Sequence, residues 1–412
     1  MDHTSPPLDM GVPFSYTDTL HSDRHPCSSW RRRPPRSSLK GTFMFHLRWH
    51  SLCLGVLLLC GTASGMPLAD GKFFIHGYGH LSTGRTWENV YLGGNDELGL
   101  HDVGSTLLFR ALPTERLIVN TQFSLEKAPG EDLELEVDYA FAEYAFSDKF
   151  RLRAGRNQLP LALYSEIYDV GTLRPFNALP QGTYGPTSIG VENYDGLGLT
   201  GRINLPAEWM VEYDAYGGFL DLKEPLSQDC DGAEGDLCVI ASQLVGGRLA
   251  LWAPLEGLRF TTSGFVSRTP VETVPGEHAV LGVVGAGAEY LGEKLWLRAE
   301  FFNLFSEAAK ARTGYLEAAY FVTPHWQVAG RVEGSRTWAP TAVPSELRTY
   351  LRHREVAVGL NYWFDPHLVF KVSFHNVIGN RFAQPAATDD LAALLHPEPH
   401  TRLLSLGAQY SF

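Results

Sequence analysis

The feature that most constrains this chain is a repeat of short segments, each eight to twelve residues long, in which apolar and polar residues alternate. The segments begin near residue 70, and the connections between them are alternately very short and longer. A period of two residues places successive side chains on opposite faces of a β-strand. Many such strands in series are typical of a membrane-spanning β-barrel. No segment after residue 65 is long and apolar enough for a transmembrane helix.

The alternation places sixteen strands, at residues 72–82, 103–112, 117–127, 135–146, 150–157, 196–205, 209–219, 242–253, 258–267, 279–290, 294–304, 313–322, 326–335, 354–364, 368–377 and 401–412. Seven connections are very short: 113–115, 147–149, 206–208, 254–257, 292–293, 323–325 and 365–367. A sixteen-strand barrel has seven turns and eight loops when both termini are periplasmic. The sequence therefore predicts an all-β fold, a 16-stranded antiparallel transmembrane β-barrel that occupies residues 66–412.

The short turns also predict which residues face each other, because a turn of fixed length sets the register of its hairpin. Counting from three turns opposes three pairs of opposite charge: Arg202 with Glu212, Arg331 with Glu317, and Arg153 with Glu143. Apolar residues then point to the other side of each hairpin. This pattern predicts charged side chains inside the barrel and apolar side chains outside.

One strand does not fit this pattern. The register that pairs Arg153 with Glu143 places Glu134, Glu136 and Asp138 on the outward face. Two explanations are open: either a β-bulge near Tyr139 reverses the alternation, or these carboxylates lie above the membrane on an extended rim.

Aromatic residues gather beside the short turns, which predicts a girdle at the headgroup level of a bilayer. They are Phe146, Phe150, Trp209, Trp252, Tyr290, Trp326, Tyr362, Trp363 and Phe364. The alternative is the ordinary aromatic core of a β-sandwich, which explains their number but not their positions. The chain also ends on an alternating segment with Phe412 as its last residue.

The N-terminal region predicts export. Residues 1–43 have no periodicity and are interpreted as disordered or as a mis-assigned extension that precedes the true start at Met44. Residues 44–65 have the layout of a signal peptide, in which the apolar run Leu52–Cys60 precedes small residues. Cleavage is expected after Ala63 or Gly65. A genuine leader of 65 residues is the alternative.

Charge and cysteine content narrow the chemistry. The formal net charge is −12, and the predicted leader carries more basic than acidic residues, so a nucleic-acid partner is not expected. Cys230 and Cys238 lie in a polar stretch of an exported chain, and we expect a disulfide between them. A pair of free thiols is the alternative. No metal site, cofactor or catalytic residue is predicted, since G-x-S-x-G and H-E-x-x-H motifs are missing from the sequence.

The stretch from 158 to 195 breaks the alternation and is the longest such connection between strands. A connection of this length without its own alternation is usually functional. We expect it to be a loop that folds into the barrel and narrows it. The candidate constriction residues are Tyr164, Glu166, Asp169, Arg174 and Glu192.

The same stretch carries a resemblance to a known family. Residues 153–181, RAGRNQLPLALYSEIYDVGTLRPFNALPQ, place Gly155-Arg156 at the end of a strand, followed by Leu159-Pro160, Asp169-Val170 and Arg174-Pro175. This order resembles Gram-negative outer-membrane porins, in particular poorly characterised ones related to the phosphate-selective type. The resemblance implies a trimer of sixteen-strand barrels with the third extracellular loop folded inward. The loop has no lysine cluster, which departs from the phosphate-selective pattern.

The sequence therefore predicts a porin in the outer membrane of a Gram-negative bacterium, with a water-filled channel for passive diffusion of small hydrophilic solutes or ions. We expect membrane lipid and lipopolysaccharide as its surroundings and a homotrimer as its assembly. The candidate pore-lining residues are Arg151, Arg153, Arg202, Arg248, Arg259, Arg298, Arg331, Lys371, Glu143, Glu212, Asp214, Glu300, Glu317 and Glu333. For each of them the alternative is an ion pair that braces the wall without touching solute.

Two other classes of function stay open at this point. One is an outer-membrane barrel enzyme, and the other is a secreted β-rich adhesin with a sandwich or β-helix fold. His76 and His80 share one face of the first strand, and we interpret them as polar residues that face the lumen.

Overall fold

The computed structural model describes residues 66–68, 71–94, 99–127, 133–185, 188, 191–224, 238–270, 278–307, 309–339, 343–385 and 396–412. The predicted leader lies outside the described residues. Cys230 does too, so the Cys230–Cys238 disulfide stays a prediction. No helix within these ranges has the length and apolar character needed to cross a membrane.

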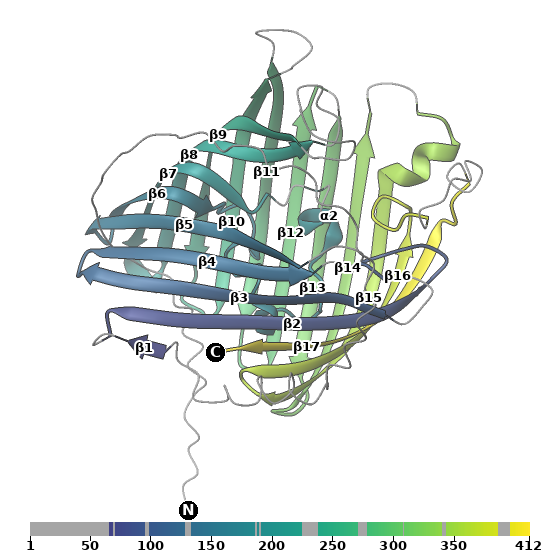
Figure 1. Ribbon diagram of the computed structural model, residues 1–412, viewed down its shortest axis with the longest axis horizontal. Helices are drawn as coiled ribbons and strands as arrows, with labels where there is room; N and C mark the ends of the chain where they lie inside the picture. Colours follow the sequence, from purple (N-terminus) through teal and green to yellow (C-terminus); the bar gives the residue numbers. More distant parts are fainter. Residues whose placement is uncertain are drawn as a thin grey trace, which may run out of the picture.

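All sixteen predicted strands are present (Figure 1). They are β2 (Phe73–Trp87), β3 (Gly99–Thr114), β4 (Leu117–Lys127), β5 (Glu134–Ser147), β6 (Phe150–Gln158), β7 (Asn193–Asn204), β8 (Met210–Glu224), β9 (Cys238–Trp252), β10 (Leu258–Pro270), β11 (His278–Leu291), β12 (Leu295–Ser306), β13 (Lys310–Phe321), β14 (Trp326–Trp338), β15 (Arg352–Asp365), β16 (Leu368–Ile378) and β17 (His400–Ser411). Most extend past the predicted ends on the side of the longer loops, because hydrogen-bonded pairing continues beyond the alternating pattern.

Each strand pairs antiparallel with its neighbour in sequence, and β17 pairs with β2, so the sheet closes into a barrel. The three predicted registers are confirmed, since Arg202 faces Glu212, Glu317 faces Arg331 and Glu143 faces Arg153. Closure satisfies the backbone of every wall strand without an open edge, as a lipid environment requires. It also rules out the β-sandwich or β-helix adhesin.

Two local features were not predicted. A short strand, β1 (Met66–Leu68), pairs with Phe73–Ile75 at the start of β2, where β17 no longer reaches. The connection between β12 and β13 consists of residues 307–309, which is as short as a periplasmic turn. The alternation of short and long connections therefore fails there, although the strand order is unaffected.

The irregular strand is explained by a bulge. In the β4–β5 pair, Gln122 faces Tyr139 and Phe123 faces Val137, so Asp138 is the extra residue. Its carboxylate accepts hydrogen bonds from Gln122 at 3.0 Å and Ser124 at 2.6 Å, and therefore points into the barrel. The bulge reverses the alternation, as expected for one extra residue. Of the two explanations, the bulge is confirmed.

The two faces of the wall have opposite character. Leu316 and Val332, which face each other across β13 and β14, are 53% and 49% exposed on the outer surface. Glu317 and Arg331, the next pair along, are each 2% exposed on the inner side. An outer apolar belt around a polar interior is the arrangement of a membrane barrel.

The aromatic girdle is confirmed in part. Phe146, Trp326 and Phe364 are 44% to 54% exposed on the outside, near the short turns. Trp363 instead points inward and packs with Trp296, as the alternation along β15 requires. Sequence position beside a turn did not distinguish the two faces.

The connection after β6 folds into the barrel. It contains three short helical turns, η1 (Ser165–Ile167), η2 (Gly171–Leu173) and α2 (Gln181–Tyr184), and Figure 1 shows α2 between the strands β2–β8 and the strands β10–β16. The helix α2 contacts β13 and β14, and η2 contacts β2 and β17. The two remaining helical turns are η3 (Pro206–Glu208) between β7 and β8 and η4 (Glu346–Leu351) before β15.

Candidate functional site

The lumen is the candidate site, and its shape is set by how the loop at residues 159–192 is fastened to the wall. The first fastening is between Glu166 of η1 and Arg248 of β9. The guanidinium of Arg248 donates to both carboxylate oxygens of Glu166, at 2.9 and 3.0 Å, and to Asp214 of β8 at 2.9 Å. Burial alone raises the pKa of Glu166, but Arg248 outweighs it and lowers that pKa to about 2. Glu166 is therefore ionised throughout the physiological pH range.

Two tyrosines make the second fastening. Tyr164 is fully buried, donates its hydroxyl hydrogen to Glu317 and accepts from Arg298 at 2.8 Å. Tyr184 donates to Glu300, which also accepts from the backbone N–H of Leu163 at 2.8 Å. Hydrogen bonds to ionised partners are stronger than neutral ones. The loop is thus held by charges of the wall and not by apolar packing alone.

The third fastening uses wall cations and loop carbonyl groups. Lys371 donates to the carbonyl oxygens of Gly171 at 2.8 Å and Arg174 at 2.5 Å. Arg331 donates to the carbonyl of Ala178 at 2.8 Å and stacks on Phe176, with its guanidinium carbon 4.7 Å from the ring centre. A loop inside a barrel needs partners for its backbone groups, and the wall provides them.

The structure divides the predicted pore-lining residues into two groups. The buried ones are Arg248, Arg298, Arg331, Lys371, Glu143, Asp214, Glu300, Glu317 and Glu333. The partly exposed ones are Arg151, Arg153, Arg202, Arg259 and Glu212. All fourteen belong to the inner side of the wall, but most of the buried group contacts the loop and stabilises it. The partly exposed group is the part that remains accessible to water.

The opposite side of the loop faces an acidic surface on β4 and β5. Asp169 accepts a hydrogen bond from Gln122, beside Asp138 and Glu126. Burial, followed by repulsion from Asp138 and Glu126, raises the pKa of Asp169 to about 6, against a smaller opposing effect of Arg174. We call Glu126, Asp138, Asp169 and Glu192 the acidic cluster.

The five candidate constriction residues therefore have different positions. Tyr164 and Glu166 are fastenings, and Asp169 faces the acidic wall. Arg174 is buried and donates to the carbonyl of Tyr168 at 3.1 Å. Glu192 is exposed at the end of the loop, where its carbonyl accepts from the N–H of Leu159 at 2.7 Å.

The sequence analysis left some charged residues of the inner wall unassigned. Asp138 was not assigned to the lumen because the bulge that turns its side chain inward was one of two open explanations. His80, interpreted as facing the lumen, forms a pair with Asp102, with 3.0 Å between Nε2 and Oδ1. Glu355 accepts from His375 at 2.9 Å and Arg331 at 3.1 Å. The alternation along β15 and β16 contained the signal for this last group.

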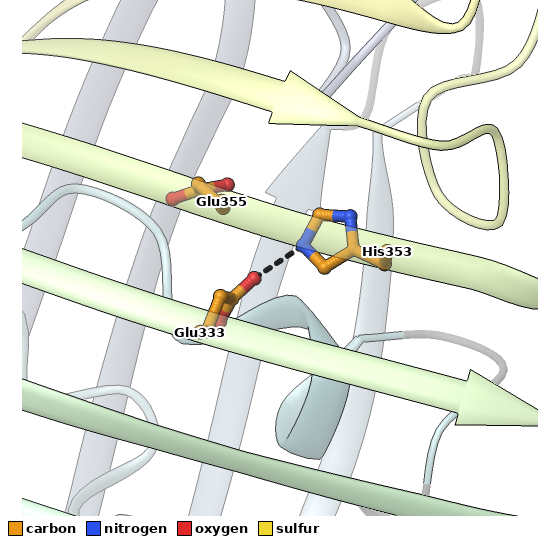
Figure 2. A group of neighbouring side chains, drawn as sticks. All are labelled: Glu333, His353 and Glu355. Carbon is orange, nitrogen blue, oxygen red and sulfur yellow. Dashed lines mark hydrogen bonds and ion pairs between the residues drawn. The ribbon is translucent and has the colours of Figure 1, made fainter.

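One group of inner-wall residues has the spacing of a metal site. One ligand atom from each of Glu333, His353 and Glu355 lies within 4.8 Å of the others (Figure 2). His353 Nε2 is already 2.5 Å from Glu333, and Glu355 is bonded to Arg331 and to the hydroxyl of Tyr91. A cation there competes with a guanidinium and a histidine that already compensate both carboxylates. We therefore interpret the group as part of the wall's ion-pair network.

No protein-family profile and no curated sequence matches this chain. Solved structures do. The anion-selective porin from Comamonas acidovorans is 13% identical, with 82% of this chain and 99% of that chain covered and a TM-score of 0.53. OmpF of Salmonella typhi, in complex with daunomycin, is 14% identical over 84% and 100% of the two chains, with a TM-score of 0.52. OmpT, an outer membrane protein of Vibrio cholerae, is 13% identical over 84% and 100%, also with a TM-score of 0.52.

This chain has the fold of the outer-membrane porins. At such low identity the likeness extends to the fold and no further. Together with the outer apolar belt, this porin-like barrel places the protein in the outer membrane of a Gram-negative cell.

Proposed function

We propose that the protein is a non-enzymatic porin that lets small hydrophilic solutes and ions diffuse through a water-filled channel narrowed by the loop at 159–192. The observation that carries this proposal is the loop itself, which is fastened inside a charged lumen while part of the charge of the wall stays exposed. Arg153 and Arg202, with side chains 20% and 38% exposed, face Glu143 and Glu212 on the inner wall. Polar and charged walls of this kind select hydrated solutes over apolar ones.

We further propose a preference for cations. The acidic cluster gathers four carboxyl groups where the loop approaches β4 and β5, with Arg174 and Arg156 as neighbouring positive groups. Negative charges lining a constriction raise the local concentration of cations. The basic residues that could favour anions are mostly bound to carboxylates or covered by the loop.

The proposal does not extend to phosphate capture. Arg174 is the only basic residue between positions 158 and 195, and its guanidinium donates to the loop's own backbone. The ammonium group of Lys371 is buried and donates to three oxygens of the protein. Neither offers a phosphate ion a ready donor.

Conductance in a planar lipid bilayer tests the channel and its selectivity. With asymmetric KCl, we expect stepwise currents and a reversal potential on the cation side. Currents that never appear at high protein concentration contradict the porin proposal, and a reversal potential on the anion side contradicts the cation preference alone.

An enzyme is the alternative to a porin, and the partly exposed His80–Asp102 pair is the feature that supports it. Such a pair can act as a general base when a nucleophile or a bound water lies beside it. Incubation of the purified protein with peptide and lipid substrates distinguishes the two classes, and the porin proposal predicts no turnover.

A further inference from the structure

A hollow of about 610 Å³ lies against the barrel wall where β12 to β15 approach their extracellular ends. It is lined by outward-pointing side chains and by the segments of wall between them. On the inner side of the same wall, α2 packs directly on Thr313 and Ser335, and a methyl group added to Gly182 would lie 2.4 Å from the Thr313 hydroxyl. The inner side has no room, so the hollow opens outward. We call it the outer hollow.

The floor of the outer hollow consists of two glycines that face each other, Gly314 of β13 and Gly334 of β14. Three apolar side chains, Phe301, Leu316 and Val332, form its membrane-facing border. They are 49% to 53% exposed and belong to the apolar belt. Because glycine has no side chain, Gly314 and Gly334 leave an apolar depression directly below the headgroup level.

Four arginines border the other end of the outer hollow: Arg312, Arg336, Arg352 and Arg354. Arg312 faces Arg336, Arg336 faces Arg352, and Arg354 faces Gly334. Side chains directly opposite on neighbouring strands have Cβ atoms about 5 Å apart, and like charges there repel. Three arginines in one row across three strands are therefore unfavourable unless an anion lies between them.

The described contacts of two of these arginines are with an amide oxygen and an aromatic ring. Arg312 donates to the amide oxygen of Asn303 at 3.1 Å, and Trp338 lies beneath both Arg312 and Arg336, at 5.6 and 4.9 Å. Within the described ranges, none of the four forms an ion pair with a carboxylate. By contrast Arg402, which is exposed at the extracellular end of β17, pairs with Glu88.

We propose that the outer hollow binds a phosphorylated lipid of the outer leaflet, of the lipopolysaccharide class. Arginine forks hold the phosphate groups, since guanidinium and phosphate match in geometry and charge. An acyl chain fills the depression over Gly314 and Gly334, against Leu316 and Val332. The ligand needs both a phosphate group and an acyl chain, because the arginines lie next to an apolar surface. This site is independent of the channel, so conductance does not report on it.

Lipid binding to the purified, full-length protein in detergent tests the site. Native mass spectrometry counts bound molecules of diphosphoryl lipid A, with phosphatidylethanolamine as a zwitterionic lipid and inorganic phosphate as a competitor. We expect a tightly bound lipid A, weaker binding of phosphatidylethanolamine, and no displacement by phosphate alone. Full displacement by inorganic phosphate overturns the assignment of a lipid.

Two matched pairs of variants locate the site. The triple change Arg312→Gln, Arg336→Gln, Arg354→Gln should weaken lipid A binding about tenfold or more, which is about 1.4 kcal/mol, whereas Arg402→Gln should leave it unchanged.

Gly334→Leu fills the hollow with little obstruction, because an added Cβ has its nearest neighbour at 3.7 Å. Gly330→Leu, with nothing within 4 Å, is its control outside the hollow. Equal lipid affinity in all four variants and the unmodified protein refutes the proposal.

Discussion

At the scale of single residues, some charged side chains of the inner wall hold the loop, and others stay exposed to water. Arg248, Arg331 and Lys371 are buried under the loop and hold it, whereas Arg153 and Arg202 stay within reach of water. A buried cation that loses its partner is costly, so the first group is sensitive to substitution for structural reasons. In the second group, Arg202 pairs with the partly exposed Glu212 and is less sensitive to substitution, whereas Arg153 compensates the buried Glu143.

The raised pKa of Asp169 predicts a pH-dependent selectivity. A carboxyl group with a pKa of about 6 is charged above that pH and neutral below it. Lowering the pH from about 7.5 to about 5 should therefore reduce the preference for cations, measured as a shift of the reversal potential toward zero. The charged or titratable groups around Asp169 are Asp138, Glu126, Arg174 and Glu192. Burial, followed by repulsion from Asp169, raises the pKa of Glu192 to about 8, so Glu192 is mostly neutral over this pH range.

The variant Asp169→Asn should show the reduced preference already at neutral pH and lose most of the pH response between these values. Glu256→Gln, in an exposed periplasmic turn, is the control and should behave as the unmodified protein does. An unchanged pH response in Asp169→Asn assigns the titration to a different carboxylate of the acidic cluster.

The Glu166–Arg248 ion pair is expected to restrain motion of the start of the loop. Because Arg248 lowers the pKa of Glu166 to about 2, the pair should persist down to about pH 4. The variant Glu166→Gln removes the charge but leaves Arg248 bonded to Asp214, so the barrel should stay folded while the start of the loop loosens. We expect more frequent current fluctuations in single-channel records, with Glu293→Gln in a periplasmic turn as the control.

At the scale of elements, the loop at 159–192 lies inside the barrel. Residues of two other connections also contact the inner wall, since Tyr91 donates to Glu355 and Phe382 packs on His353. The three fastenings of the loop bring together β8, β9, β12, β13, β14 and β16. The loop therefore links strands of one half of the barrel to one another, in addition to narrowing the lumen.

Shortening the segment from Glu166 to Tyr184 should raise single-channel conductance, by about twofold or more, since a sixteen-strand barrel without an inner loop encloses a wide aqueous lumen. The same deletion uncovers Arg298, Arg331 and Lys371 and should lower thermal stability, measured by circular dichroism in detergent. Replacement of the segment by a glycine-serine linker is the control. An unchanged conductance in both variants places the segment outside the ion path.

At the scale of the whole molecule, a closed wall with an apolar exterior requires a bilayer or detergent for solubility. The resemblance found in the sequence predicts a homotrimer. Extraction should require detergent, and unheated samples should migrate in electrophoresis as an oligomer that boiling converts to the unfolded monomer. Conductance steps should occur in groups of three. Migration as a folded monomer with single steps refutes the trimer.

The acidic cluster and the outer hollow show where sequence reasoning stopped. The sequence offered a bulge near Tyr139 as one of two explanations for the carboxylates of β5, and only the register between β4 and β5 identifies Asp138 as the extra residue. The four arginines of the outer hollow lie on three strands, and only the register between those strands brings them into one row.

The sequence by itself determined the barrel: its strand number, its polar interior and three of its registers follow from a period of two residues and from the lengths of the turns. These are local properties, and each hairpin fixes its own pairing. The tertiary structure alone decided which inner charges are covered by the loop and which stay exposed. That division depends on where a segment without periodicity meets strands more than a hundred residues further along the chain, and no local pattern encodes such a meeting.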